Sequence, residues 1–217
     1  MRAYFDKLLN PSQQQKQLPF IFPLIISLIA GGVFSLALAP FYWWWLAILS
    51  PALLYACLKG CSPKQAFALG LSYGFGLWFV GAFWLYTSIY VYGDTNAALS
   101  VLMIVIMALL MGLFTAVQTW VYRRFFPETP LTFAPLWVLF EWSKTWVFTG
   151  FPWLFAGYAF TERFLDSYAP LFGVFAISFV VILLACALVE VINRKIFWVV
   201  PSALLLLGAC GASYITF

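Results

Sequence analysis

The sequence predicts an all-α membrane protein, a polytopic bundle of about seven transmembrane helices. Of its 217 residues, 65% are hydrophobic and only 8% are charged, whereas a soluble domain carries about 25% charged residues. The mean hydropathy is +0.99. The apolar residues form long uncharged runs, which indicate helices, because a strand of a membrane barrel needs only about 10 alternating residues.

The expected helices follow from the thickness of the bilayer. A hydrocarbon core of about 30 Å requires roughly 20 apolar residues, each of which adds about 1.5 Å to a helix. A cytoplasmic segment, 1–19, precedes one transmembrane domain that covers residues 20–217. Within that domain we expect seven helices, at 20–39, 42–58, 66–89, 97–121, 132–148, 170–189 and 196–217.

The first and third spans carry small residues at positions that favour close packing. The run 20–39 is longer than the 7–15 apolar residues of a signal peptide, so we interpret it as a retained helix. Small faces let helix backbones approach one another in lipid. We expect contacts within the chain, with a dimer interface as the alternative, at Ser27, Gly31, Ser35 and Ala39 and at Gly70, Gly74 and Gly81.

Aromatic residues gather at the start of the second span and at the end of the third. Tryptophan and tyrosine are enriched where a bilayer meets water, so interfacial anchoring explains them. A surface that handles lipid is the functional alternative. The residues are Trp43, Trp44 and Trp45 in the first group and Tyr86, Tyr90 and Tyr92 in the second.

The loops between the spans differ in their content of Lys and Arg, which sets the orientation of a membrane protein. Arg163 is alone on one side, and Lys144 lies within a span. This bias predicts a cytoplasmic N-terminus and, after seven spans, a C-terminus on the outer side of the membrane. The other side holds nine basic residues: Arg2, Lys7, Lys16, Lys59, Lys64, Arg123, Arg124, Arg194 and Lys195.

The remaining composition excludes several kinds of chemistry. The chain has no histidine, so neither a Cys–His pair nor a Ser–His–Asp triad can be assembled from it. Cys57 and Cys61 are expected at the reducing cytoplasmic side without the further ligands that zinc requires, and we expect no metal or cofactor. The net charge of +4 is spread too thinly to suggest nucleic acid.

The fifth span is the least ordinary, because it contains Glu141 and Lys144. Its strongly apolar residues favour insertion by roughly 2–4 kcal/mol, and two central charges oppose it by roughly 5–7 kcal/mol. The helix therefore cannot stand alone in lipid with both ions central. Three residues separate the two charges, so they can meet on one face. They form either an ion pair that faces the bundle or a contact for a polar headgroup or partner.

The stretch after this span breaks the helical pattern but stays apolar. Gly150 and Pro152 interrupt a helix, and the residues remain aromatic or apolar up to Thr161. A solvated loop of this composition would be unfavourable. We therefore expect the segment to dip into the outer leaflet or to line a cavity, where it meets a lipid tail.

These residues also carry a resemblance. The stretch 140–154, Phe-Glu-Trp-Ser-Lys-Thr-Trp-Val-Phe-Thr-Gly-Phe-Pro-Trp-Leu, followed by Gly157-Tyr158, resembles the membrane domain of bacterial apolipoprotein N-acyltransferases. Further agreement lies in Ala39-Pro40-Phe41, in Gly81-Ala82-Phe83-Trp84-Leu85-Tyr86 and in Pro170-Leu171-Phe172-Gly173-Val174, so the resemblance covers essentially the whole chain. Lys144 stands where the family commonly has a basic residue, often Arg.

The resemblance implies an enzyme of the bacterial inner membrane that moves an acyl chain from a phospholipid to a lipoprotein. The acceptor is the α-amino group of the N-terminal S-diacylglyceryl cysteine. In the family, a Cys thioester assisted by Glu and Lys forms in a periplasmic nitrilase-like domain, which follows the seventh span. The chain ends about where that domain should begin, so we expect no catalytic residue in it and no acyl transfer by it alone. Both substrates would be engaged through the missing domain.

Within this chain, the expected role is to hold the catalytic domain at the membrane and to shape a lateral entrance for lipid. A stand-alone membrane scaffold or lipid-binding protein is the alternative. A small transporter would need converging polar residues, of which only Glu141, Lys144 and Asp94 are available. The candidate substrate or lipid contacts are Glu141, Lys144, Gly150, Phe151, Pro152 and Trp153.

Overall fold

The computed structural model describes residues 19–212, and these residues form a bundle of helices without a β-strand. The expected N-terminal segment, apart from Pro19, and the last five residues of the seventh expected span lie outside the described residues. The α-helices are α2 (Ile21–Phe34), α3 (Leu46–Leu58), α4 (Pro63–Gly81), α5 (Leu85–Thr87), α6 (Ala97–Phe125), α7 (Pro130–Ser143), α8 (Ala169–Ile192) and α9 (Val199–Ala212).

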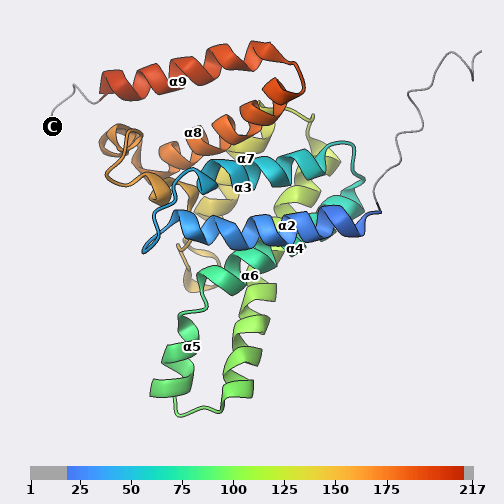
Figure 1. The fold of residues 1–217 in the computed structure, drawn as a ribbon, viewed down its shortest axis with the longest axis vertical. Helices are drawn as coiled ribbons and strands as arrows, with labels where there is room; N and C mark the ends of the chain where they lie inside the picture. Colours follow the sequence, from blue (N-terminus) through green and yellow to red (C-terminus); the bar gives the residue numbers. More distant parts are fainter. Residues whose placement is uncertain (1–18, 213–217) are drawn as a thin grey trace, which may run out of the picture.

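The helices α2, α3 and α8 lie side by side, and α5 with the first half of α6 extends away from them as a hairpin (Figure 1). Short turns complete these elements: the 3-10 turn Ser35–Ala37 extends α2, and a π turn, Ser88–Tyr92, follows α5. A break after Gly81 bends the pair α4 and α5 by 59°. The all-α architecture is the one that the sequence predicts.

Local sequence explains where two of the long helices begin. Ser62 caps α4: its hydroxyl accepts from the Gln65 N–H, and the Gln65 side chain accepts from the Ser62 N–H, with Pro63 at the first helical position. Asn96 caps α6 by accepting a hydrogen bond of 2.9 Å from the Leu99 N–H. Such caps satisfy amide groups that the first turn leaves without partners.

Small residues bring the backbones of α2, α4 and α6 close together, as their spacing predicts. A Cβ atom on Gly31 of α2 would overlap the Tyr73 carbonyl of α4, and one on Gly76 of α4 would overlap the Leu28 carbonyl of α2. Gly74 of α4 likewise meets Gly112 of α6. The predicted packing within the chain is confirmed, because these contacts join helices of the same molecule.

The expected number of seven spans is not reproduced by helix length. Within residues 19–212, Ala97–Phe125 and Asp166–Ile192 are long and apolar enough to cross a membrane, and the bent pair Pro63–Gly81 with Leu85–Tyr92 makes a third span if it counts as one. The helices Ile21–Ala37, Leu46–Leu58 and Ile196–Gly211 are apolar but shorter. The expected helix 132–148 stops at Ser143, because the chain turns back there.

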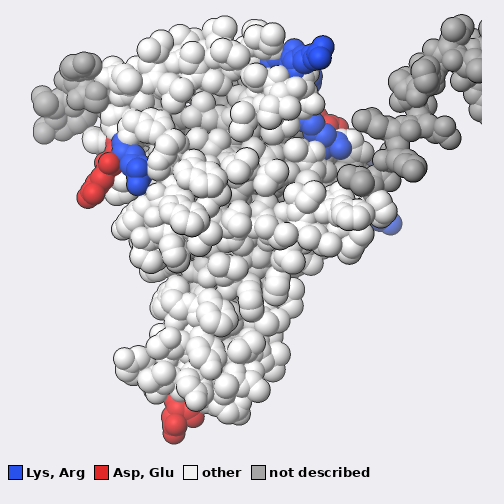
Figure 2. Space-filling view, viewed as in Figure 1, with Lys and Arg blue, Asp and Glu red and all other residues white. Residues whose placement is uncertain are grey.

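One end of the bundle gathers most of the basic residues, and we call it the basic end: Lys59, Lys64, Arg123, Arg124, Arg194 and Lys195. Charged groups lie only at a few edges of an otherwise uncharged face (Figure 2). At the basic end, Glu190 is 1% exposed and pairs with Lys59 at 2.7 Å and with Lys195 at 3.0 Å. The Tyr55 hydroxyl donates to the same carboxylate at 2.8 Å. These contacts join the ends of α3 and α8.

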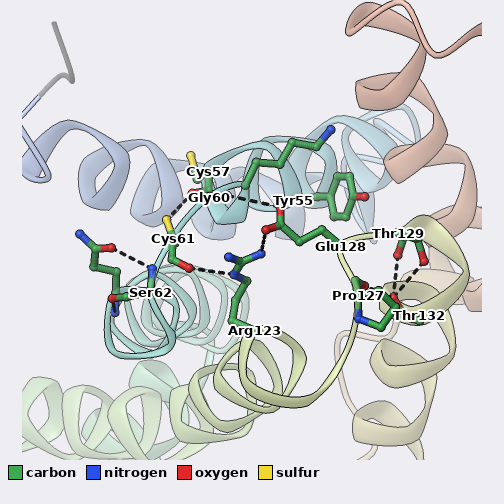
Figure 3. A network of polar contacts seen from close by, with 12 residues as sticks. Tyr55, Cys57, Gly60, Cys61, Ser62, Arg123, Pro127, Glu128, Thr129 and Thr132 are labelled. Carbon is green, nitrogen blue, oxygen red and sulfur yellow. Dashed lines mark hydrogen bonds and ion pairs between the residues drawn. The ribbon is translucent and has the colours of Figure 1, made fainter. Parts of the chain in front are cut away.

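A second network at the basic end joins the loop after α3 to the loop after α6 (Figure 3). Arg123 donates through Nε to the Cys61 carbonyl at 2.9 Å and pairs with Glu128. Glu128 in turn accepts from the Gly60 N–H at 3.3 Å. The two loops are therefore held together by one arginine and one carboxylate.

Candidate functional site

The largest described cavity lies at the end of the bundle opposite the basic end. Its volume is about 720 Å³. Three parts of the chain form its wall: the end of α2 with the loop that follows, the break between α4 and α5, and the segment 152–161. The lining residues are Ser35, Leu38, Ala39, Tyr42, Gly81, Trp84, Pro152, Trp153, Leu154, Tyr158 and Thr161. We call this space the first cavity.

The segment that forms one wall is a tight loop after α7. Gly150 has a φ of +87°, which favours glycine, and a Cβ there would overlap the Thr145 carbonyl. The Phe151 N–H then donates to the Lys144 carbonyl at 2.7 Å, and the Trp153 N–H donates to the Phe151 carbonyl at 2.8 Å. Gly150 therefore lets the chain reverse, so that Phe151 packs on Trp78 and Trp153 packs beside Trp84.

Glu141 fastens this loop from within. Its side chain is 2% exposed, and its Oε1 accepts from the Trp137 Nε1–H at 2.9 Å and from the Ala156 N–H at 2.8 Å. The Oε2 atom has no hydrogen-bond partner within residues 19–212. The Gly157 N–H donates to the Ser178 hydroxyl of α8 at 2.9 Å. The loop is thus held between α7 and α8 by one carboxylate and one hydroxyl.

Lys144 does not pair with Glu141. The ion pairs of the described residues join Lys59 and Lys195 to Glu190 and Arg123 to Glu128. The Lys144 ammonium instead lies 5.7 Å from the centre of the Trp78 ring and 5.1 Å from that of Phe155. Of the two sequence-based alternatives, the internal ion pair is therefore wrong. Lys144 is the C-terminal cap of α7, and its N–H still donates to the Phe140 carbonyl at 3.3 Å.

A second cavity of about 300 Å³ contains the Lys144 side chain. The other residues of its wall are apolar and come from α5, α6 and the loop after α7. We call it the second cavity, and its lining residues are Leu85, Met107, Met111, Phe114, Lys144, Val147 and Phe151. A cation at the edge of an apolar space matches the two parts of a phospholipid, an anionic phosphate and a hydrocarbon chain.

A row of aromatic rings separates the two cavities. Phe151, which lines the second cavity, stacks on Trp153, which lines the first, with ring centres 5.8 Å apart and 11° between the planes. Trp78 lies behind Phe151 at 5.3 Å, and Trp84 lies beside Trp153 at 5.9 Å. Each pair has the separation at which aromatic side chains stabilise one another.

The structure divides the six candidate residues into three groups. Pro152 and Trp153 line the first cavity, and Lys144 and Phe151 line the second. Glu141 and Gly150 line neither of these two cavities, and they shape the loop instead. The sequence analysis did not select the other residues of the first cavity, although Trp84 and the break at Gly81 belong to a motif that it singled out.

The arrangement places a few polar groups in two mainly apolar spaces. The first cavity offers the hydroxyls of Ser35, Tyr42, Tyr158 and Thr161 among apolar side chains, and the second offers one ammonium. The thiols lie elsewhere: Cys57 and Cys61 are at the basic end, Cys186 is buried in α8, and Cys210 is in α9. The two spaces can therefore hold and orient an apolar ligand through shape and a few polar contacts.

Comparison with known proteins gives a consistent result. Residues 30–187 match the apolipoprotein N-acyltransferase N-terminal domain. The chain is 41% identical over 191 residues to the apolipoprotein N-acyltransferase of Pseudomonas syringae pv. tomato. The aligned residues make up 84% of this chain and 38% of that protein. It is 37% identical over 179 residues to the Coxiella burnetii protein of the same name, covering 79% of this chain and 37% of the relative.

The chain thus spans about a third of the length of the curated relatives that it matches. The same holds for the Azotobacter vinelandii apolipoprotein N-acyltransferase, which is 41% identical over 172 residues that make up 76% of this chain and 33% of the relative. The matched domain contains α3, α4, α6 and α7 completely, together with most of α8. Both cavities lie within the matched residues.

Proposed function

The chain belongs to the apolipoprotein N-acyltransferase family, in which it represents the N-terminal membrane domain, and we propose that it forms the lipid-facing half of such an enzyme. In this proposal, the complete protein moves a fatty acyl chain from a phospholipid to the N-terminal amino group of an S-diacylglyceryl cysteine. The chain alone performs no acyl transfer. Its own task is to present the lipid to a catalytic domain that carries the Glu, Lys and Cys residues.

The observation that carries the proposal is the pair of cavities divided by Phe151 and Trp153. The first cavity lies at the end of the bundle opposite the basic end, the second lies beside the middle of α6, and the walls of both are mainly apolar. The second cavity places the Lys144 ammonium next to this hydrocarbon surface, where it can contact the phosphate of a phospholipid. The first cavity, at about 720 Å³, falls in the range of pockets that hold a small ligand.

Positioning is the means by which this half would contribute to catalysis. Acyl transfer gains several kcal/mol from a fixed geometry at the reacting carbonyl, and an error of about 1 Å can cost about 10²-fold in rate. Glu141 fixes the loop that carries Phe151 and Trp153 through the Ala156 N–H. These residues act on the substrate through placement, and the covalent steps belong to the catalytic domain.

The distribution of charge supports an orientation for the proposed enzyme. Cytoplasmic loops carry an excess of Lys and Arg, so the basic end faces the cytoplasm and the first cavity opens near the periplasmic face of the inner membrane. Arg163, whose guanidinium donates to the Tyr42 carbonyl at 3.3 Å, is the one basic residue that the sequence analysis assigns to a loop at the cavity end. A lipid of the outer leaflet would then have access to the first cavity.

The test begins with the reading frame of the gene beyond codon 217. A frame that continues into a domain with the family's Glu, Lys and Cys supports the proposal. The encoded full-length protein and the chain alone are then incubated with labelled phospholipid and an S-diacylglyceryl-cysteine peptide. We expect N-acylated peptide from the former and no thioester or product from the latter. A stop codon, or thioester formation by the chain alone, contradicts the proposal.

A further inference from the structure

The basic end carries a third cavity, which shares no lining residue with the first or the second cavity. Its volume is about 390 Å³, and it lies between the start of α4 and the end of α6. Lys64 and Phe67 line it from α4, and Val117 and Trp120 line it from α6. One ammonium group therefore borders three apolar side chains at the end of two membrane helices.

The cations around this cavity lack the carboxylate partners that neutralise their neighbours. Lys59 and Lys195 share Glu190, and Arg123 pairs with Glu128. Within residues 19–212, Lys64 and Arg124 form no ion pair. The described partner of the Arg124 guanidinium is the Phe125 ring, 5.5 Å away. The basic end therefore has unbalanced positive charge, and it lies on the two helices that form the cavity.

Helix geometry places Arg124 on the side of α6 that borders the third cavity. Residues four apart on a helix share a face, so Arg124 projects from the same side as Trp120. Lys64 lies in the first turn of α4, where the helix macrodipole is positive and favours an anion. Trp120 is 37% exposed, and a tryptophan at this depth is typical of the boundary between headgroups and acyl chains.

An apolar stripe continues from Trp120 along α6 toward the middle of the membrane. Val117, Leu113 and Leu110 follow at spacings of three and four residues and are 39%, 41% and 59% exposed. From Trp120 to Leu110 the helix rises about 15 Å, which equals one leaflet of a core about 30 Å thick. The stripe therefore has the length of the acyl chains of one leaflet, with the two free cations at its headgroup end.

We propose that Lys64, Arg124 and Trp120 bind the headgroup of an anionic phospholipid in the leaflet at the basic end, with its acyl chains along Val117, Leu113 and Leu110. Two cations complement a headgroup of net negative charge, such as that of phosphatidylglycerol. A zwitterionic headgroup brings its own cation to the site, and so gains less from it. Lys64, Arg124 and Trp120 line neither candidate cavity, and the proposal does not depend on acyl transfer.

Native mass spectrometry of the purified chain tests the proposal directly. The protein in detergent micelles receives equal amounts of phosphatidylglycerol and phosphatidylcholine, and the retained lipids are counted. We expect one retained phosphatidylglycerol in preference to phosphatidylcholine. The preference should fall about 5-fold in Lys64→Gln or Arg124→Gln and about 30-fold in the double variant, since each basic residue near a membrane surface contributes about a factor of five.

Arg194→Gln is the matched control, because Arg194 is an exposed cation of the basic end that lines none of the described cavities. Its preference for phosphatidylglycerol should equal that of the wild type. Glycerol 3-phosphate should not displace the lipid, because the stripe on α6 contributes only to an acyl-bearing ligand. The proposal is overturned if the wild type retains the two lipids equally. It is also overturned if Arg194→Gln loses as much preference for phosphatidylglycerol as Lys64→Gln or Arg124→Gln does. Thermal unfolding in phosphatidylcholine micelles checks that every variant is folded.

Discussion

The Glu141 carboxylate accepts a hydrogen bond of 2.8 Å from the Ala156 N–H, although 15 residues separate them in the chain. The same oxygen accepts from the Trp137 indole one helical turn earlier. A buried carboxylate thus ties the loop that carries Phe151 and Trp153 to α7. The loop is held by a specific polar contact inside an apolar bundle, where the loss of such a contact is costly.

Replacing Glu141 tests this contact. Glu141→Ala leaves the Trp137 indole and the Ala156 N–H without an acceptor, and we expect a loss of roughly 1–3 kcal/mol for each group that stays buried and unpaired. Glu141→Gln keeps one acceptor oxygen and should cost less than Glu141→Ala. Thermal unfolding of the purified chain in detergent measures both. Equal stability of Glu141→Ala and the wild type contradicts the assignment.

The close approach of α2 and α4 predicts a strong effect at Gly76. Gly76→Ala places a methyl group against the Leu28 carbonyl, and forcing extra volume into such a contact typically costs about 1–3 kcal/mol. Gly211→Ala in α9 is the control, because among residues 19–212 no atom beyond its own helical turn lies within 4 Å of the added Cβ. It should change stability by less than about 1 kcal/mol. The two midpoints of thermal unfolding, compared with that of the wild type, decide the prediction.

The ionic cluster at the basic end predicts a role for a tyrosine hydroxyl. Tyr55 is 1% exposed and donates to Glu190 at 2.8 Å, so Tyr55→Phe removes a hydrogen bond to a charged group, worth about 1.5–3 kcal/mol. Tyr90→Phe is the control, since Tyr90 is 44% exposed. Unfolding in denaturant should separate the two variants. Indistinguishable midpoints would show that the hydroxyl contributes nothing.

The reactivity of Cys61 should depend on pH in a defined direction. Burial raises the pKa of the Cys61 thiol, and nearby Glu128 acts in the same sense while Arg123 opposes it. Fewer thiolates are therefore present at neutral pH than in an exposed cysteine, and the thiolate is the reactive form. In a variant that retains only this cysteine, maleimide should react more slowly with the folded than with the denatured protein. The folded rate should rise as the pH increases above neutrality.

The long helices could be predicted from composition, and their interruptions could not. The run 97–121 agrees closely with α6, Ala97–Phe125, because it is long and uncharged and Asn96 caps it. The run 66–89 hides the break after Gly81, since the residues on both sides remain apolar and aromatic. A bend inside an apolar run depends on what the helix packs against, and at Gly81 the neighbour is the Leu154 side chain.

The importance of the segment 140–154 was predictable, but the partners of its charges were not. Three-residue spacing suggested that Glu141 and Lys144 meet, whereas α7 ends between them and Lys144 turns to the Trp78 and Phe155 rings. Glu141 instead accepts from Ala156. Both outcomes depend on how the loop folds back on the bundle, which is a tertiary contact and leaves no periodic pattern in the sequence.

The most direct test of the proposed lipid site is N-acylation by the full-length protein with Trp153→Ala. Trp153 stacks between the two cavities, and its loss should lower kcat/KM for acyl transfer by about tenfold or more, as expected when roughly 1.4 kcal/mol of positioning is removed. The control is Trp142→Ala, since Trp142 is 48% exposed against 45% for Trp153 and lines none of the described cavities. We predict near wild-type acylation for Trp142→Ala. Equal activity of the two variants at equal expression would contradict the account.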